Sequence, residues 1–104
     1  MNCIQNNEDF SKLKSSMEDI ASEFFECLRN LTKSSTKKTN SALFIKRVKD
    51  AYSKLDMLEQ NFINNEFFYQ DYPDWWRKKY SKTTFYRIKK QSMKDFLEAF
   101  NRAS

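Results

Sequence analysis

Apolar side chains recur at every third or fourth position through residues 8–31. This first stripe consists of Phe10, Leu13, Met17, Ile20, Phe24, Leu28 and Leu31. At about 100° per residue, the spacing lines one face of an α-helix and predicts an amphipathic helix over residues 8–31. Residues 32–40 contain no apolar side chain and are rich in Ser and Thr, so they predict a polar loop.

A second stripe follows with the same spacing. It consists of Phe44, Val48, Ala51, Leu55, Leu58 and Phe62, with Ile45 and Tyr52 beside it. It predicts one continuous helix over residues 41–68. Two long stripes joined by a polar loop indicate an antiparallel helical hairpin. The spacing also permits a homodimer through these N-terminal helices, because a two-helix hairpin leaves apolar surface uncovered.

The C-terminal third begins with an aromatic cluster around a single proline. Pro73 suits the first turn of a short helix over residues 74–79, where its missing N–H is not needed. Trp75 and Trp76 point about 100° apart on such a helix, so we expect one to pack between helices and the other to be exposed. Ser81 is a good N-cap for a longer helix over residues 82–103.

The cations and the aromatic residues of this last helix separate onto different faces. On a helical wheel an apolar arc of roughly 140° holds Phe85, Ile88, Ser92, Met93, Phe96 and Phe100. A second arc of about 60° holds Thr83, Arg87, Lys90 and Lys94, with Tyr86 at its edge. Lys89 falls inside the apolar arc, so we expect its side chain to extend past the core to water.

Composition agrees with an all-α chain. At 104 residues the length suits a single domain, 1–104. The absence of Gly argues against a hairpin-rich β architecture and against a Gly-rich phosphate loop. The predicted fold is therefore a long helical hairpin, residues 8–68, followed by a C-terminal helix-turn-helix, residues 72–104, with a long recognition helix.

The net charge of +5 is concentrated in one segment. Residues 72–94 carry eight cations and one anion, a charge of +7, whereas the rest of the chain carries 11 cations and 13 anions, a charge of −2. A basic segment on a nearly neutral body is the electrostatic footprint of nucleic-acid binding. The plainer interpretation is a solvated, lysine-rich helix, and composition does not separate the two.

Several other functions are disfavoured by the residues present. The chain has no His, which removes the usual catalytic base and metal ligand, and its paired acids look like solvation and capping charges. Cys3 and Cys27 have no metal-site spacing, and Cys27 is expected in the core. We therefore expect no enzyme activity, no cofactor and no metal. No stretch is apolar enough to cross a bilayer, and the expected location is cytoplasmic.

The stretch YSKTTFYRIKKQSMKDFLEAF resembles the helix-turn-helix of sigma-factor region-four-like proteins, and most of all the ArpU-type phage transcriptional regulators. In that pattern a Ser starts a recognition helix that reads Thr-aromatic-Tyr-Arg-x-Lys-Lys and ends in an apolar tail. The matching residues are Ser81, Thr84, Phe85, Tyr86, Arg87, Lys89 and Lys90, with Phe96, Leu97 and Phe100 as the tail. The resemblance covers residues 72–103.

The resemblance implies a small DNA-binding protein that acts in transcription, as a regulator or a sigma-like accessory factor. Its partners would be double-stranded DNA and RNA polymerase. Arg87, Lys90, Thr83 and Thr84 would face the major groove, flanked by Tyr86, Lys82 and Lys94, while Arg77, Lys78 and Lys79 would hold phosphates. The alternative is a helical interaction module that binds an acidic protein partner or RNA through its basic C-terminal helix.

The sequence departs from that pattern just ahead of the recognition helix. The family has an acidic-apolar-Ala first helix and a Gly in the turn, whereas this chain has Asp74-Trp75-Trp76 and places Lys79 at or near the Gly position. A left-handed conformation is costly for Lys. We therefore expect a turn that is differently shaped or one residue shorter.

Overall fold

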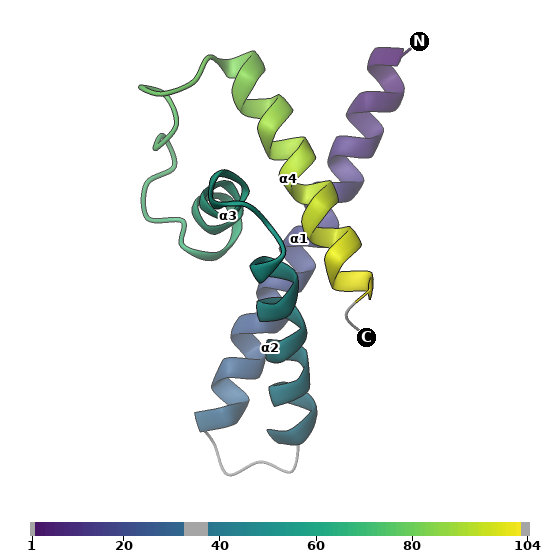
Figure 1. Cartoon of the computed structure of the whole chain (residues 1–104), viewed down its shortest axis with the longest axis vertical. Helices are drawn as coiled ribbons and strands as arrows, with labels where there is room; N and C mark the ends of the chain where they lie inside the picture. Colours follow the sequence, from purple (N-terminus) through teal and green to yellow (C-terminus); the bar gives the residue numbers. More distant parts are fainter. Residues whose placement is uncertain (1, 33–37, 103–104) are drawn as a thin grey trace.

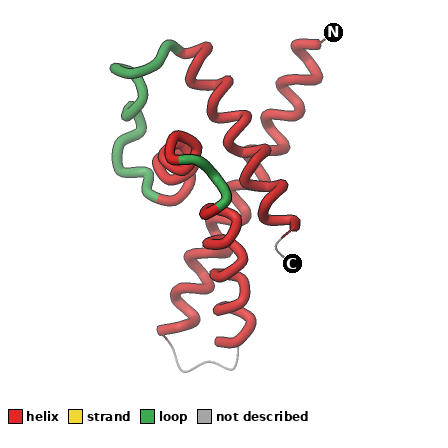
Figure 2. The backbone as a smooth tube through the Cα atoms, in the orientation of Figure 1, coloured by secondary structure: helices red, strands yellow, loops and turns green. Residues whose placement is uncertain are grey.

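The computed structural model describes the backbone of residues 2–32 and 38–102, and the side chains of residues 9–32 and 38–102. Every regular element within these ranges is helical, which confirms the all-α class (Figure 1, Figure 2). The elements are α1 (Asn2–Thr32), α2 (Lys38–Ser53), α3 (Met57–Ile63), the π-helical turn η1 (Asn64–Phe68) and α4 (Lys82–Arg102).

Helices α1 and α2 form the antiparallel hairpin that the two apolar stripes predicted (Figure 1). The 31 residues of α1 extend for about 46 Å, close to the longest dimension of the molecule, 48 Å. The helix starts at Asn2, earlier than the predicted residue 8. Residues 2–7 contain no Gly or Pro, so nothing in the chain stops the helix ahead of the apolar stripe.

The single helix predicted over residues 41–68 is wrong, because the chain turns at residues 54–56. Leu55 N–H donates to the Tyr52 carbonyl at 3.1 Å, a tight i→i+3 bond that ends α2. Asp56 then adopts an extended conformation and its carboxylate accepts from Glu59 N–H at 2.8 Å. This N-cap starts a new helix in a new direction. The apolar periodicity continues across this turn, so the stripe gives no sign that one helix ends and another begins.

The break allows α3 to leave the hairpin and pack against α4 (Figure 1). After α3 the helix continues as the wider π-helical turn η1. There Tyr69 N–H donates to the Asn64 carbonyl at 2.7 Å, an i→i+5 bond. Such π-helical turns are rare and are often found at functional sites. Here the turn directs Glu66 and Phe67 toward α4.

The short helix predicted over residues 74–79 is also wrong, and the helix-turn-helix is not confirmed. Successive turns replace it, with Arg77 N–H donating to the Asp74 carbonyl at 3.1 Å and Lys79 N–H to the Trp76 carbonyl at 2.9 Å. A regular helix would point the two tryptophans about 100° apart. The irregular turns let both pack inward. No described residue has a positive φ, so Lys79 avoids the left-handed conformation in a differently shaped turn.

Helix α4 starts where the sequence predicted, and it crosses α1 (Figure 1). Thr84 N–H donates to the Ser81 hydroxyl at 3.2 Å, which confirms the N-cap. Residue 103, the predicted end, lies outside the described residues. Near the C-terminal end of α4, Arg47 of α2 donates from Nε to the Phe100 carbonyl at 2.8 Å, and its guanidinium lies 3.9 Å from the centre of that ring. This contact joins α4 to the hairpin.

One hydrophobic core connects all of these elements. Its buried residues are Met17, Ala21, Val48, Ala51, Leu55, Ile63, Phe67, Met93, Phe96 and Phe100. Cys27 is also buried, as predicted. Leu28 and Leu31 of α1 and Leu58 of α3 belong to the predicted stripes but are exposed. Helix periodicity therefore identified the buried faces, and tertiary packing decided how far along each face the burial extends.

Candidate nucleic-acid interface

Most of the predicted DNA-binding side chains lie on the surface. The exposed ones are Arg77, Lys78, Lys79, Lys82, Thr83, Tyr86, Arg87 and Lys94. Thr84 and Lys90 are half-buried; the Thr84 hydroxyl accepts a hydrogen bond from the Ser81 hydroxyl at 3.0 Å, so it helps to close the helix cap. We call the side of α4 that carries Thr83, Arg87, Lys90 and Lys94 the basic face.

The basic face has the segregation that the helical wheel predicted. Opposite it, Phe85, Ser92, Met93, Phe96 and Phe100 are all buried. The buried Ser92 is satisfied within the helix, because its hydroxyl donates to the Ile88 carbonyl at 2.8 Å. From Arg87 to Lys94 the basic face extends for about 10 Å, two helical turns. A straight row of cations on one side of a helix can follow a phosphate backbone.

The structure narrows the set of cations that can meet a polyanion. Arg77 pairs with Asp74, with Nε 3.1 Å from the carboxylate, and its guanidinium lies 5.9 Å from the Trp76 ring. Five other predicted contacts are exposed and make no ion pair with any described residue. These are Lys78, Lys79, Lys82, Arg87 and Lys94. Their positive charges have no protein partner in the described part of the chain.

Lys89 contradicts the prediction that its ammonium extends to water. Only 8% of the residue is exposed, and its Nζ donates to Glu66 Oε1 at 2.7 Å. The ammonium also lies 5.4 to 5.7 Å from the ring centres of Phe10, Phe67 and Phe85. The π-helical turn places the Glu66 carboxylate beside the apolar arc of α4. No feature of the α4 sequence indicates that Lys89 has this partner. Lys89 is therefore not available to a nucleic acid.

Glu66 also holds the segment that leads into α4. Its second oxygen, Oε2, accepts from Trp75 Nε1 at 2.7 Å. One carboxylate thus links η1, the turns at residues 73–79 and α4. Because the carboxylate is hydrogen-bonded through both oxygens, its burial is compensated. The segment that carries Lys78 and Lys79 is therefore joined to α4 through Trp75, Glu66 and Lys89.

Both tryptophans pack inward, which corrects the expectation that one would be exposed. Trp76 stacks on Phe85 with ring centres 4.1 Å apart and planes tilted by 16°. Trp75 meets Phe62 edge-on at 4.9 Å. Both residues are half-buried. The turns at residues 73–79 therefore cover the inner side of α4, as the first helix of a helix-turn-helix would, but without helical geometry.

Sequence reasoning missed a contribution from α1. Lys12 and Lys94 both line a cavity of about 270 Å³ between α1 and α4, together with Asp9, Leu13 and Ser16. Lys12 therefore extends the basic face onto a second helix, although the Asp9 carboxylate reduces the local positive charge. No local pattern connects two residues that lie this far apart in the chain, so only the packing of α1 on α4 reveals the pair.

A different charge pattern lies between α3 and α4. Burial raises the pKa of the Glu59 carboxyl to about 7, with a hydrogen bond to Asp95 and the negative charges of Asp95 and Asp56 acting in the same direction. Glu59 and Asp95 line a cavity of about 480 Å³, and Lys54 and Arg102 are also part of its lining. This side of α4 is mixed in charge and is not a surface for a polyanion.

The described residues contain no group of three His, Cys, Asp or Glu side chains placed to hold a metal ion. Within the same ranges, no helix is both long enough and apolar enough to cross a membrane.

Comparisons of the chain with protein-family models, with curated proteins and with solved structures return no match. The resemblance of residues 72–103 to sigma region-four-like proteins therefore stays a prediction based on those residues.

Proposed function

We propose that this chain binds double-stranded DNA through the basic face of α4 and the basic turn ahead of it. The observation that carries the proposal is the set of five exposed cations without an ion pair among the described residues, all within residues 78–94. Lys and Arg side chains neutralise phosphates and release counterions, which supplies most of the sequence-independent affinity for DNA. Arg87 sits in the middle of the row, where it can reach a guanine edge in the major groove.

The resemblance to sigma region-four-like proteins gives this binding a role in transcription, as a regulator or sigma-like accessory factor. RNA polymerase is then a further partner, and the N-terminal hairpin is the part of the chain left for protein contacts or for a homodimer. Leu28 and Leu31 support this assignment, because the apolar stripe of α1 remains exposed at these two positions.

Salt-dependent binding to duplex DNA tests the proposal. If five cations each neutralise one phosphate, log Kobs should fall against log salt with a slope of about −4 to −5. Fluorescence anisotropy of a labelled duplex, titrated with protein between about 50 and 200 mM salt, measures this slope. Absence of duplex binding at micromolar protein and the lowest salt contradicts the proposal.

Two variants separate phosphate contacts from base reading. Lys78→Ala should weaken all duplexes alike and reduce the slope by about 1, whereas Arg87→Ala should also relax sequence preference. Lys38→Ala is the matched control, because Lys38 is the exposed first residue of α2, and the start of α2 lies far from the start of α4 (Figure 1). Equal effects of the Arg87 and Lys78 variants on every duplex would exclude Arg87 as a base reader.

A second candidate is the binding of an acidic protein or of RNA through the same cations. The specific observation in its favour is the irregular structure of residues 73–79, which lacks the first helix of a helix-turn-helix. Competition decides between the two: a duplex should displace a labelled single-stranded RNA or an acidic peptide if DNA is the preferred partner. Tighter binding of either competitor than of duplex DNA would favour this second candidate.

A further inference from the structure

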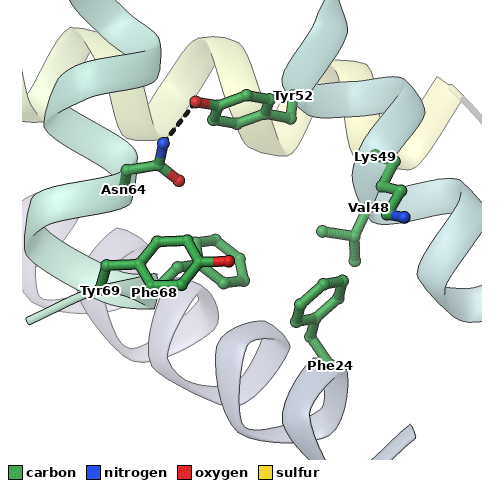
Figure 3. A pocket seen from close by; sticks show the side chains of 7 residues that line it. All are labelled: Phe24, Val48, Lys49, Tyr52, Asn64, Phe68 and Tyr69. Atoms are coloured by element: carbon green, nitrogen blue, oxygen red, sulfur yellow. Dashed lines mark hydrogen bonds between the residues drawn. The ribbon is translucent and has the colours of Figure 1, made fainter. Parts of the chain in front are cut away.

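An apolar cavity is lined by residues of the hairpin and of the turn that follows α3. It has a volume of about 260 Å³ and lies between α1, α2 and the π-helical turn η1 (Figure 3). Its lining consists of Phe24, Val48, Lys49, Tyr52, Asn64, Phe68 and Tyr69. None of these residues belongs to α4 or to the basic turn, so the cavity is independent of the proposed DNA surface.

The walls are held by contacts within the protein. Phe24 and Phe68 meet edge-on with ring centres 5.3 Å apart. On the opposite wall, the Asn64 amide donates to the Tyr52 hydroxyl (Figure 3). The i→i+5 bond of η1 places Asn64, Phe68 and Tyr69 around one wide turn. A cavity whose walls are already ordered requires little further ordering when a ligand enters.

The polar groups at this cavity define the chemistry of a ligand. Lys49 is exposed, is the only charged residue of the lining, and forms no ion pair with a described residue. Tyr69 is 62% exposed, and Figure 3 shows its hydroxyl directed toward the space between the rings. Figure 3 draws the Lys49 ammonium at the edge of the space, on the far side of Val48 from the Tyr69 hydroxyl. Because an exposed lysine side chain changes rotamer readily, this ammonium can turn to an anion at the rim, and it would disfavour a cationic ligand.

We propose that this cavity binds a small aromatic carboxylate, one ring with a short acidic side chain. The ring would pack among Phe24, Val48 and Phe68, where its edge and face complement those of the lining aromatics. The carboxylate would pair with Lys49 at the rim and accept a hydrogen bond from the Tyr69 hydroxyl. A dry cavity of about 150 Å³ accommodates benzene, so 260 Å³ leaves room for a ring and a short chain.

Three probes of one shape and different charge test this assignment. They are 3-phenylpropanoate, its neutral amide 3-phenylpropanamide, and the cation 3-phenylpropylamine. Titrations at pH 7, followed by the backbone amide resonances of the ¹⁵N-labelled full chain, should give saturable shifts at residues 24, 48–52 and 64–69 for the carboxylate. The dissociation constant expected for so small a ligand is about 1 mM.

Lys49→Met retains most of the apolar stem and removes the charge. It should weaken 3-phenylpropanoate about tenfold and leave the amide unchanged. Tyr69→Phe should weaken the carboxylate about threefold by removing one hydrogen bond. Lys38→Met is the matched control on the same helix and should change neither ligand.

Three results would overturn the proposal. The first is equal affinity of the wild-type chain for the acid, the amide and the amine. The second is an unchanged affinity for the acid in Lys49→Met. The third is the absence of saturable shifts at the cavity residues up to about 10 mM acid, roughly tenfold above the expected dissociation constant.

Discussion

The buried ion pair between Lys89 and Glu66 is the feature that most directly tests how α4 is held. The side chains are only 10% and 12% exposed, and Nζ lies 2.7 Å from Oε1. In Lys89→Met the ammonium is removed, and the Glu66 carboxylate retains only the hydrogen bond from Trp75. An uncompensated buried charge costs far more than a lost surface contact, so this substitution should destabilise the chain strongly.

The magnitude follows from the burial. Breaking a buried pair by removing one partner costs about 3 to 5 kcal/mol, and the residual exposure of both side chains favours the lower end, about 3 kcal/mol. A domain of this size has a free energy of unfolding on the order of 5 to 15 kcal/mol. Lys89→Met should therefore remove a fifth or more of the total stability.

The same chain offers a matched surface pair. Lys46 Nζ lies 2.8 Å from Asp50, nearly the same separation, but these side chains are 72% and 49% exposed. Lys46→Met should cost only about 0.3 to 0.5 kcal/mol. Urea unfolding at pH 7, followed by helical circular dichroism and by tryptophan fluorescence, gives both free energies. A cost for Lys89→Met no larger than that for Lys46→Met would refute the reasoning.

The double variant Lys89→Met/Glu66→Gln separates charge burial from packing. The glutamine amide that replaces the Glu66 carboxylate still offers an oxygen to Trp75, and a methionine in place of Lys89 can pack against the surrounding aromatic rings. Replacing both charges should restore the stability to within about 1 kcal/mol of the wild type. A double variant as unstable as Lys89→Met would show that the cost comes from lost packing of the lysine stem.

Three further predictions address other parts of the fold. The pKa of Glu59 is raised from 4.5 to about 7, so the folded state binds more protons between these values and the free energy of unfolding should fall as pH rises from about 4.5 to about 7. The expected decline is on the order of 1 kcal/mol, because solvent screens a partly buried carboxyl. Glu59→Gln should remove the decline, and a Glu59→Gln variant with the same pH profile of urea unfolding as the wild type would contradict this prediction. Asp56→Ala removes the N-cap of α3 and should cost about 1 kcal/mol, whereas Asp56→Asn should cost less; equal costs in urea unfolding would contradict a capping role. Trp76→Ala should lower the free energy of unfolding by about 2 kcal/mol, and it should weaken duplex binding because it releases the turn that carries Lys78 and Lys79. Trp76→Phe retains the stack on Phe85 and should bind the duplex nearly as tightly as the wild type.

Residues 54–56 show why one helix boundary escaped prediction. The apolar stripe continues through Leu55 to Phe62 and gives no sign of a turn, since a chain can turn without losing its apolar period. Asp56 is the local signal that was present, because Asp three residues ahead of Glu is a common helix start. This signal does not stand out, because a chain rich in charged residues contains many similar pairs.

The candidate site was predictable in part. The positions of Thr83, Arg87 and Lys94 on one side of α4 follow from helix geometry alone, and the structure exposes all three. The burial of Lys89 and the contribution of Lys12 could not be predicted. Each depends on a partner from another element, Glu66 of η1 or the α1–α4 contact, whose position is set by the whole fold.

The amino-acid sequence by itself determined the all-α class, the buried faces of the helices, the cap at Ser81 and the concentration of positive charge in residues 72–94. These are properties of local periodicity and local chemistry, which do not require knowledge of distant contacts. Only the tertiary structure decided that α3 leaves the hairpin, that both tryptophans pack inward through irregular turns, and that one lysine of the basic segment is neutralised in the core. The reason is physical: burial of aromatic rings and pairing of a buried charge depend on residues far apart in the chain, and they outweigh the local preference for regular helix.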